Sequence, residues 1–435
     1  MPKRARRETG SFGRAACLVA AALLFGQAPL RAAETPVGKL VASKAPGWPQ
    51  WRGPLRNGIS DETGLLQSWP EGGPKVLWTV DGLGRGYSSP IVTGDVLTIT
   101  GDVGNELRIF AFGLEGKPKW QAANGGAWKR SWPGCRSSCT YDAGRLFVMN
   151  ALGRVACLDP ATGKEIWATN ILERFGGKFG TWGLAEGLLV DGRRVIVTPV
   201  GSKALMAALD RDTGATLWAT EPIAGDAPGY ASPILFEMAG RRQIVSYSSR
   251  YAFGVDAASG KLLWKARWAT GSGLIGPMPV LDGDGILASG STKDGGVLMR
   301  LRLRPTTGGV AAERVWTAPL DDLHGTSVLL DGRLYGSGHE THKAWACVDS
   351  QTGKILYAAS HMVKGSVVYA DRRLYCLSED GVMRLVEPTA TALETRGEFR
   401  LVKTHKRDVW SHPVVCGGRL YLRYHDKLWC YDIRR

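Results

Sequence analysis

The sequence lacks the cysteine spacings that bind zinc or attach a haem. It contains eight cysteines, but none belongs to a Cys-x-x-Cys or Cys-x-x-Cys-His motif, which excludes a cysteine zinc knuckle and a covalently bound haem. No two cysteines are adjacent. Cys135 and Cys139 can be joined only if the chain turns between them. Beyond the N-terminal leader described next, an odd number of cysteines remains, so in an oxidising compartment at least one thiol is unpaired or pairs between chains.

Long apolar runs are scarce as well, and the one that stands out lies at the N-terminus. It covers residues 15–25, follows four basic residues between Lys3 and Arg7, and precedes Ala32 and Ala33. At about 11 residues it is shorter than the roughly 20 needed to span a bilayer. A basic start, a short apolar run and small residues are typical of a secretory signal. We therefore expect residues 1–33 to be a signal peptide and the protein to be periplasmic or secreted; an uncleaved anchor is the alternative.

The charge is strongly of one sign, and the formal net charge is +15. Loss of the leader leaves about +10, which favours contact with anionic polymers of the cell envelope or simply a basic surface. No run interleaves aromatic and basic residues at a known motif spacing, which argues against a nucleic-acid partner. Apart from the leader, nothing indicates an integral membrane protein, and we expect a monomer.

Helix-forming residues do not dominate, whereas glycine and tryptophan are abundant, with 57 and 16 copies. Short runs of Val, Ile, Leu and Tyr are separated by Asp-Gly and Gly-Arg pairs. Glycine supplies turns with positive φ, and β-branched and aromatic residues suit a pleated sheet. The composition therefore predicts an all-β protein.

One pattern recurs along the chain: an apolar strand ending in Asp, two residues, Thr-Gly or Ser-Gly, then three residues and a Trp or Tyr. Its clearest copies are residues 158–167, 209–218, 255–264 and 348–357, and weaker copies end at Trp120, Trp316 and Phe399. Neighbouring copies are about 41 to 52 residues apart, the length of a propeller blade. Asp is expected to cap the turn, Thr-Gly to reverse the chain, and Trp to cover the gap between blades.

A second landmark opens each repeat, clearest at 88–92, 231–235 and 410–415. It leads through a turn to a second strand, so each repeat reads as four short strands. Residues 428–432 are a third strand without a fourth, and residues 76–80 are a fourth strand without the other three. Together they would complete an eighth blade from both ends of the chain. We predict an all-β, eight-bladed β-propeller of four-stranded antiparallel blades, with seven blades as the alternative.

The repeats resemble those of the pyrroloquinoline-quinone (PQQ) quinoprotein propellers. Residues 48–54 with 56–58, together with 173–177 and 181–183, are similar to PQQ-binding-like envelope propellers of a planctomycete-like group. The resemblance covers nearly the whole mature chain and implies the fold far more than the function. The expected organisation is a signal peptide (1–33), an N-terminal extension lying on the propeller (34–75) and the propeller domain (76–435).

Candidate site residues come from loops that a propeller gathers over its central channel. All seven histidines lie in such loops of the last three blades, and the charged residues beside them are Glu340, Lys343, Lys364, Glu379, Asp380 and Asp426. Four tryptophans also lie outside the repeat motif, in loops between blades: Trp128, Trp132, Trp182 and Trp410. The candidates for binding a ligand or cofactor at the channel mouth are Tyr87, Trp128, Arg130, Arg136, Trp182, Glu186, Tyr230, His324, His339, His342 and His412.

These residues support two interpretations. They can form a site in which aromatic faces stack on a quinone or sugar and histidines exchange protons, or they can be ordinary solvated loop residues. His339 and His342 are three apart in a turn, a weaker metal motif than a helical His-Glu-x-x-His, and we predict no metal site and no specific catalytic residue.

Two functions follow from the resemblance. One is a PQQ-dependent alcohol or sugar dehydrogenase, which would hold the quinone with calcium. The other is a non-catalytic propeller that binds an envelope protein, a small molecule or a carbohydrate. Many quinoprotein dehydrogenases carry a disulfide between adjacent cysteines, which this sequence lacks, and we could not place a calcium-binding set of side chains. We therefore favour a binding or scaffold module without a bound quinone, and keep the dehydrogenase as the alternative.

Overall fold

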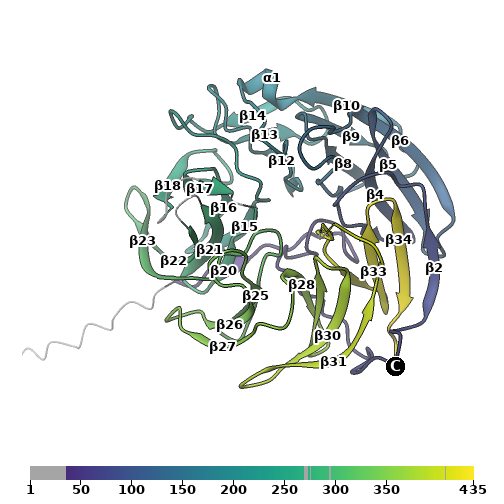
Figure 1. The fold of residues 1–435 in the computed structure, drawn as a ribbon. Helices are drawn as coiled ribbons and strands as arrows, with labels where there is room; N and C mark the ends of the chain where they lie inside the picture. The colour runs from purple at the N-terminus through teal and green to yellow at the C-terminus, as the bar shows by residue number, and fades with distance from the viewer. Residues whose placement is uncertain (1–35, 269–272, 275, 293–294, 407) are drawn as a thin grey trace, which may run out of the picture. The chain divides into compact units, whose positions relative to one another are not determined.

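Residues 36–435 form a ring of eight β-sheets in the computed structural model (Figure 1). The structure describes residues 36–268, 273–274, 276–292, 295–406 and 408–435. The predicted signal peptide, residues 1–33, lies outside the described residues. Within them the only helix is α1 (Ile171–Phe175), and no helix there has the length and hydrophobicity to cross a bilayer. The prediction of an eight-bladed, all-β propeller is confirmed.

Each blade is an antiparallel sheet, and in blades 1 to 7 its four strands follow one another in sequence from the axis of the ring to its rim. Blade 1 is β3 (Ile91–Thr93), β4 (Val96–Val103), β5 (Glu106–Gly113) and β6 (Pro118–Gly126). Blade 2 is β7 (Thr140–Asp142), β8 (Arg145–Met149), β9 (Arg154–Leu158) and β10 (Glu165–Asn170). Blade 3 is β11 (Leu189–Asp191), β12 (Arg194–Val197), β13 (Ala207–Asp210) and β14 (Thr216–Ala219). Blade 4 is β15 (Ile234–Met238), β16 (Arg241–Tyr247), β17 (Tyr251–Asp256) and β18 (Leu262–Arg267), with β1 (Lys39–Leu40) added beside β15.

The second half of the ring repeats this plan. Blade 5 is β20 (Val280–Asp282), β21 (Gly285–Thr292), β22 (Gly295–Thr306) and β23 (Gly309–Ala318), with β19 (Gly273–Leu274) pairing with β21. Blade 6 is β24 (Val328–Leu330), β25 (Arg333–Ser337), β26 (Trp345–Asp349) and β27 (Ile355–Ala359). Blade 7 is β28 (Gly365–Ala370), β29 (Arg373–Ser378), β30 (Val382–Pro388) and β31 (Leu393–Arg400). Blade 8 is β32 (Val414–Cys416), β33 (Arg419–Tyr424), β34 (Lys427–Asp432) and β2 (Val76–Val80).

Blade 8 closes the ring with strands from both ends of the sequence, as predicted. β2 supplies its outer strand and pairs antiparallel with β34, with Trp78 opposite Cys430 and Val80 opposite Leu428. In Figure 1 the purple β2 lies beside the yellow β34 at the rim. β2 comes before all other blade strands in the sequence and β34 comes after them. Their pairing therefore joins the first blade strand to the last.

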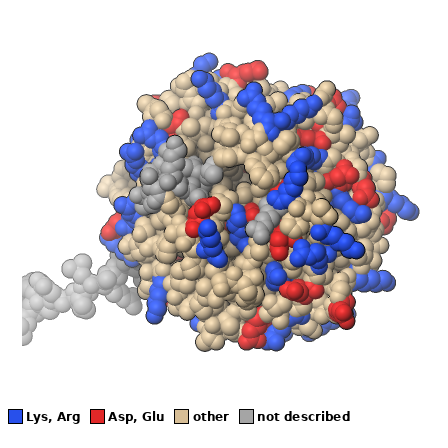
Figure 2. Space-filling model, in the orientation of Figure 1, with Lys and Arg blue, Asp and Glu red and all other residues tan. Residues whose placement is uncertain are grey.

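The outer surface carries charges of both signs. Lys and Arg side chains are spread over the face drawn in Figure 2, with Asp and Glu between them. This agrees with a sequence in which 55 Lys and Arg outnumber 40 Asp and Glu. Such a surface favours the approach of anionic partners without defining one.

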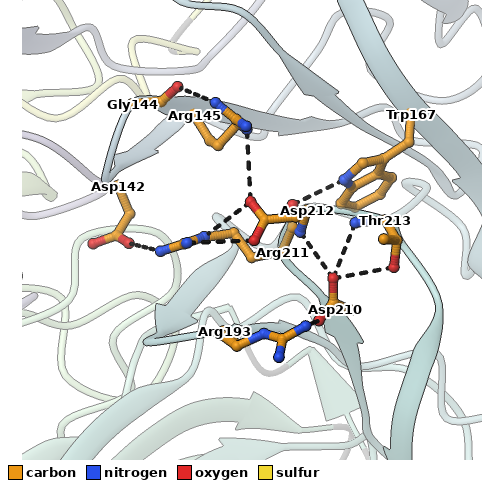
Figure 3. Close-up of polar contacts among 9 residues, drawn as sticks. All are labelled: Asp142, Gly144, Arg145, Trp167, Arg193, Asp210, Arg211, Asp212 and Thr213. Carbon is orange, nitrogen blue, oxygen red and sulfur yellow. Dashed lines mark hydrogen bonds and ion pairs between the residues drawn. The ribbon is translucent and has the colours of Figure 1, made fainter.

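The repeat motif works as the sequence predicts, which the third blade shows best (Figure 3). Asp210 ends β13, and its Oδ1 accepts hydrogen bonds from the backbone N–H groups of Asp212 and Thr213, at 3.0 Å each. The Thr213 hydroxyl donates to the same oxygen at 3.0 Å. Trp167, from the preceding blade, donates its indole N–H to the Arg211 carbonyl at 2.9 Å. The capped turn is therefore also the docking point for the neighbouring blade.

Glycine is required at this turn for two reasons. Gly214 has φ +71°, and a Cβ atom there would lie 2.6 Å from the ring of Trp167. The same contact recurs at Gly353, where a Cβ would lie 2.6 Å from Trp316. The left-handed backbone disfavours any residue with a side chain. The tryptophan ring also leaves no room for a Cβ atom on the glycine. The conserved geometry of the repeat is thus a tryptophan lying on the glycine of the next blade.

Residues 36–75, here called the strap, run along the blades before β2. β1 pairs with β15, Trp48 exchanges backbone hydrogen bonds with Val92 at 2.8 and 2.9 Å, and Ser60 donates to the Tyr369 carbonyl. Farther along, Leu66 donates to the Ile433 carbonyl. The strap therefore contacts blades on several sides of the ring.

Two arginines of the strap enter the axis of the ring. Arg52 donates to the carbonyls of Ser327 and Val367, both at 3.1 Å, and these belong to the starts of blades 6 and 7. Arg56 donates to the carbonyls of Gly187, Leu188 and Pro233 at 2.7 to 3.1 Å, at the starts of blades 3 and 4. Both side chains are buried. Carbonyl oxygens of blades 6 and 7 thus bind one guanidinium group, and those of blades 3 and 4 bind the other. The two arginine side chains of the strap therefore fill the axis.

The apolar core is divided among the junctions between blades. Each buried cluster joins neighbouring sheets, as where Phe147 and Met149 of blade 2 pack with Val195 and Val197 of blade 3. Seven cysteines of the described residues are buried as free thiols, with no disulfide between them: Cys135, Cys139, Cys157, Cys347, Cys376, Cys416 and Cys430.

Candidate functional site

A pocket of about 350 Å³ lies over the axis of the ring, where the loops leading into the blades meet. Every blade contributes at least one residue to it, because each innermost strand begins next to the axis. Trp51 of the strap also lines the pocket, and its neighbours Arg52 and Arg56 fill the axis, so the pocket is closed on that side. Its lining is Trp51, Tyr87, Trp132, Arg136, Ser138, Trp182, Ala185, Gly187, Tyr230, Ser232, Gly276, Leu323, His324, His339, Lys364, Glu379 and Trp410. We call this cavity the mouth pocket.

Trp410 is the centre of the aromatic wall. Its ring stacks with His324 at a centroid distance of 4.3 Å and with Tyr87 at 4.6 Å. Trp132 contacts it at 5.0 Å with the planes tilted by 53°, and this indole is 40% exposed although it is large and apolar. On the opposite wall Trp182 and Tyr230 meet edge to face at 5.5 Å. The pocket thus offers several aromatic surfaces at different inclinations.

Glu379 organises the polar wall. Its Oε1 accepts hydrogen bonds from the indole N–H of Trp410 at 2.9 Å, and lies 3.1 Å from Lys364 Nζ and 3.4 Å from His324 Nδ1. Burial opposes ionisation of this carboxyl, but the hydrogen bond from His324 and the charge of Lys364 lower the pKa of Glu379. It is therefore a carboxylate at neutral pH whose charge is balanced by Lys364.

Both histidines of the pocket are held neutral. Burial lowers the pKa of His324, and burial together with the charge of Lys364 lowers the pKa of His339. Lys364 Nζ lies 2.7 Å from His339 Nδ1, which accepts its hydrogen bond. Neutral imidazoles next to an ammonium–carboxylate pair can accept and donate hydrogen bonds to a ligand.

The loop that carries His339 depends on a buried carboxylate. Asp321 is fully buried and accepts hydrogen bonds from the backbone N–H groups of His339, Glu340 and Thr341 at 2.7 to 3.2 Å. Sequence reasoning missed this role, because an Asp-Asp pair before a His is no motif by itself. It also missed Trp51, whose place in the pocket depends on the path of the strap.

Arg136 is the second cation of the mouth pocket. Its two Nη atoms donate to the carbonyls of Gly134 and Trp132, both at 2.8 Å, and its guanidinium lies 5.2 Å from the centre of the Tyr87 ring. Burial lowers the pKa of Arg136, opposed by nearby groups such as Tyr87. The side chain is thus fixed by backbone acceptors and an aromatic face at the edge of the pocket.

The structure gathers six of the eleven sequence candidates in the mouth pocket: Tyr87, Arg136, Trp182, Tyr230, His324 and His339. The others lie elsewhere. Trp128 is buried and donates its indole N–H to the Ser131 carbonyl, and the exposed Arg130 lies over Phe179. The backbone N–H of His342 also donates to Asp321, and His342 does not line the pocket.

His412 lies beneath the pocket and links it to the strap. Its Nε2 donates to the His324 carbonyl at 2.9 Å, and its Nδ1 accepts from Arg52 at 3.2 Å. Its ring packs against Trp51 at 4.4 Å. Burial and the charge of Arg52 lower the pKa of His412 to about 3. A permanently neutral imidazole therefore connects Arg52 to the wall that carries His324.

Glu186 lies next to the axis, beside a separate small cavity shared with Thr198 and Tyr247. Its Oε1 accepts from the Thr198 backbone N–H at 2.8 Å. Within the described chain, its Oε2 and the Thr198 hydroxyl are buried without a hydrogen-bond partner. Burial raises the pKa of Glu186 to about 7, although Thr198 and Arg56 act against it.

Replacing Glu186 with Gln is expected to stabilise the protein increasingly as the pH rises from about 4.5 to 8. Because the folded-state pKa is raised, the folded protein keeps a proton that the unfolded chain has lost, and wild-type stability falls across this window. Gln keeps the acceptor for Thr198 and cannot ionise. Above pH 7 the free energy of unfolding of the variant should exceed that of the wild type by about 3 kcal/mol. Urea unfolding at several pH values measures this difference. The exposed Glu237→Gln is the control, and unfolding free energies that stay parallel at every pH would contradict this explanation.

The carboxylates and histidines do not assemble into a metal site. In the part of the chain that the structure describes, no group of three His, Cys, Asp or Glu side chains is placed to hold a metal ion. Glu379, the carboxylate of the mouth pocket, is already bound by Lys364 and Trp410. The residues of the pocket therefore do not fit calcium.

Comparisons with solved structures support the fold. BamB from Moraxella catarrhalis is 16% identical, with a TM-score of 0.56 over 83% of this chain and 98% of that chain. The quinohemoprotein alcohol dehydrogenase from Comamonas testosteroni is 12% identical, with a TM-score of 0.61 over 90% of this chain and 81% of that chain. The computationally designed protein Ika8 is 10% identical, with a TM-score of 0.55 over 82% of this chain and all of that chain. At these identities the likeness concerns the fold alone.

The sequence comparisons identify the family. No curated protein matches the sequence. The family model PQQ_2, described as outer membrane protein assembly factor BamB, matches residues 108–359. This match covers more than half of the chain and spans blades 1 to 6, including the clearest copies of the Asp-Thr-Gly-Trp repeat. The chain therefore belongs to the PQQ_2 family of PQQ-type β-propellers.

Proposed function

We propose that the protein is an exported binding and scaffold module of the cell envelope that holds a small ligand in the mouth pocket. The observation that carries this proposal is the pocket itself. It is closed on the side of the axis by Trp51 and combines aromatic surfaces with fixed polar groups, which is typical of small-molecule sites. Side chains held before a ligand arrives lose little freedom when it binds.

Two further features support a place in the envelope. The family description is that of an outer membrane assembly factor, and the N-terminal sequence has the pattern of a secretory signal. A propeller rim with exposed outer strands also leaves room for a protein partner. We infer that a docking role and ligand binding use different parts of the same ring.

The quinoprotein alternative has weaker support. The solved structures similar to this protein include an alcohol dehydrogenase. However, among the described residues the mouth pocket has no group of side chains placed to coordinate calcium. Tyr87 and His324 already stack on Trp410, so they occupy ring surface of Trp410 that a flat quinone would need. The side chains present do not fit the cofactor, and we assign no redox step to this protein.

Trp410→Ala is expected to abolish ligand binding, because it removes the surface on which Tyr87 and His324 stack. Trp132→Ala, a change at a partly exposed position, is expected to weaken binding about 10-fold without lowering the melting temperature. The measurement is a titration of the mature protein with saccharides, short peptides, and PQQ with calcium, followed by tryptophan fluorescence and thermal unfolding. A ligand that binds only the folded state raises the melting temperature.

The results separate the alternatives. A shift with PQQ and calcium that Trp410→Ala removes would restore the dehydrogenase. A shift with another ligand that the same variant removes supports the binding module. If no compound in the panel raises the melting temperature of the wild type, the proposal of a ligand-binding mouth is wrong.

A further inference from the structure

The mouth pocket has an unbalanced positive charge. Two cations and one carboxylate line it, and Lys364 with Glu379 forms a balanced pair at 3.1 Å. Arg136 has no carboxylate within 4 Å among the described residues, and its hydrogen bonds go to two neutral carbonyls. The carboxyl of Asp102 acts on Arg136 only from beyond this distance, so Arg136 is a partly buried cation without a direct ion pair. Such a cation gains electrostatic energy from an anion brought next to it.

Arg136 is also presented to the pocket in a fixed position. Two backbone carbonyls hold its Nη atoms, and the Tyr87 ring supports the guanidinium plane at 5.2 Å. Little side-chain freedom is left to lose on binding. A guanidinium that keeps unused N–H groups suits a carboxylate, which accepts them in its own plane.

The aromatic surfaces indicate the body to which this anion belongs. Trp132 is tilted by 53° from Trp410, and Trp182 by 70° from Tyr230. A flat aromatic ligand stacks best on parallel surfaces. A puckered ring with C–H faces on both sides and hydroxyl groups at its edge fits tilted surfaces better. The lining of the pocket also holds polar side chains that can meet such hydroxyls, namely Ser232, His324, His339 and Lys364.

We propose that the mouth pocket binds an acidic saccharide, whose sugar ring lies against the tryptophans and whose carboxylate pairs with Arg136. This inference rests on the proposed ligand-binding function and adds the class of the ligand. The basic surface of the protein would raise the local concentration of such a polyanion or its fragments. Arg136 is thereby the residue that distinguishes an acidic sugar from a neutral one.

The test compares D-glucuronate with D-glucose, which differ by one carboxylate, in titrations of the mature protein followed by tryptophan fluorescence and calorimetry. The wild type should bind glucuronate at least about 10-fold more tightly than glucose, and this preference should shrink as salt is added. Arg136→Gln should reduce the preference to less than about 3-fold, because it weakens the binding of glucuronate far more than that of glucose.

Arg130→Gln is the matched control, since Arg130 is an exposed arginine six residues away that does not line the pocket. It should leave both affinities unchanged. Equal binding of glucuronate and glucose by the wild type, or equal effects of the two substitutions, would overturn the assignment of an acidic saccharide. The salt dependence of the wild type decides the question even if Arg136→Gln does not fold.

The acidic-saccharide assignment can fail while the proposed ligand-binding function holds. If a neutral sugar or another compound binds and Trp410→Ala removes it, the mouth pocket is a ligand site and only the acidic class is wrong. If no ligand affects the wild type, both inferences fail together.

Discussion

Arg52→Ala is expected to lower the free energy of unfolding by about 3–5 kcal/mol, the range found when one partner of a buried charged network is removed. The guanidinium is buried among the carbonyls of Asn57, Ser327 and Val367, which would lose their donor. Asp322, whose charge faces Arg52, would remain buried without its cation. Urea unfolding at pH 7 measures the loss, and an unchanged m-value would show that the unfolded state is the same.

Arg372→Ala is the control for this prediction, because Arg372 is an exposed arginine with a similar side chain. It should change stability by less than about 0.5 kcal/mol. Arg52→Lys keeps the charge but not the forked geometry, and it should fall between the two. A loss below about 1 kcal/mol for Arg52→Ala would mean that water replaces the guanidinium at the axis, and the strap would then not be the element that holds the ring together there.

Gly214→Ala is expected to destabilise the protein by about 3–4 kcal/mol. The left-handed backbone costs alanine about 1–2 kcal/mol, and the added Cβ must displace the indole of Trp167, which lies 2.6 Å from its position. Displacing Trp167 also breaks its hydrogen bond to the Arg211 carbonyl. Thermal and urea unfolding of the purified variant give the measurement.

Gly144→Ala isolates the backbone contribution. Gly144 has φ +76°, close to that of Gly214, but a Cβ there meets no atom within 4 Å. It should therefore cost only the 1–2 kcal/mol of the left-handed conformation. In a double-mutant cycle with Trp167→Ala, the cost of Gly214→Ala should fall toward the Gly144→Ala value, because the clash is gone. Equal costs for the two glycines in the wild-type background would show that the Trp–Gly contact does not stabilise the blade junction.

The fold could be predicted from the sequence because the repeat is local and physical. Asp, Thr and Gly specify a capped turn wherever they occur at the right spacing, and Trp167 shows that the aromatic residue of the motif docks on the next copy. The pairing of residues 76–80 with 428–432 could also be predicted, since each segment lacks the strands that the other supplies. The path of the strap could not, because Arg52 and Arg56 bind carbonyls, which every residue possesses and no sequence pattern reveals.

The site was predictable only in part for the same reason. Tyr87, Arg136, Trp182, Tyr230, His324 and His339 are in the mouth pocket because each stands in a loop that leads into a blade or joins its middle strands. Trp128 stands in such a loop too, yet it turns into the core and bonds to Ser131. Loop membership places a backbone near the axis, but the direction of a side chain depends on packing. Asp321 shows that a residue outside the pocket can also be important to it, because this buried carboxylate holds the loop that carries His339.

The closure of blade 8 has a consequence for the order of events while the chain is synthesised. A chain that emerges from its N-terminus presents β2 long before β34, its partner, exists. Until β34 arrives, β2 is an unpaired strand, and the strap has only some of the blades that bind Arg52 and Arg56. Contacts this distant in sequence form late in folding. The wall of the mouth pocket includes Trp410, which lies in the loop that leads into blade 8. The pocket is therefore completed only when the last blade is made and the ring closes.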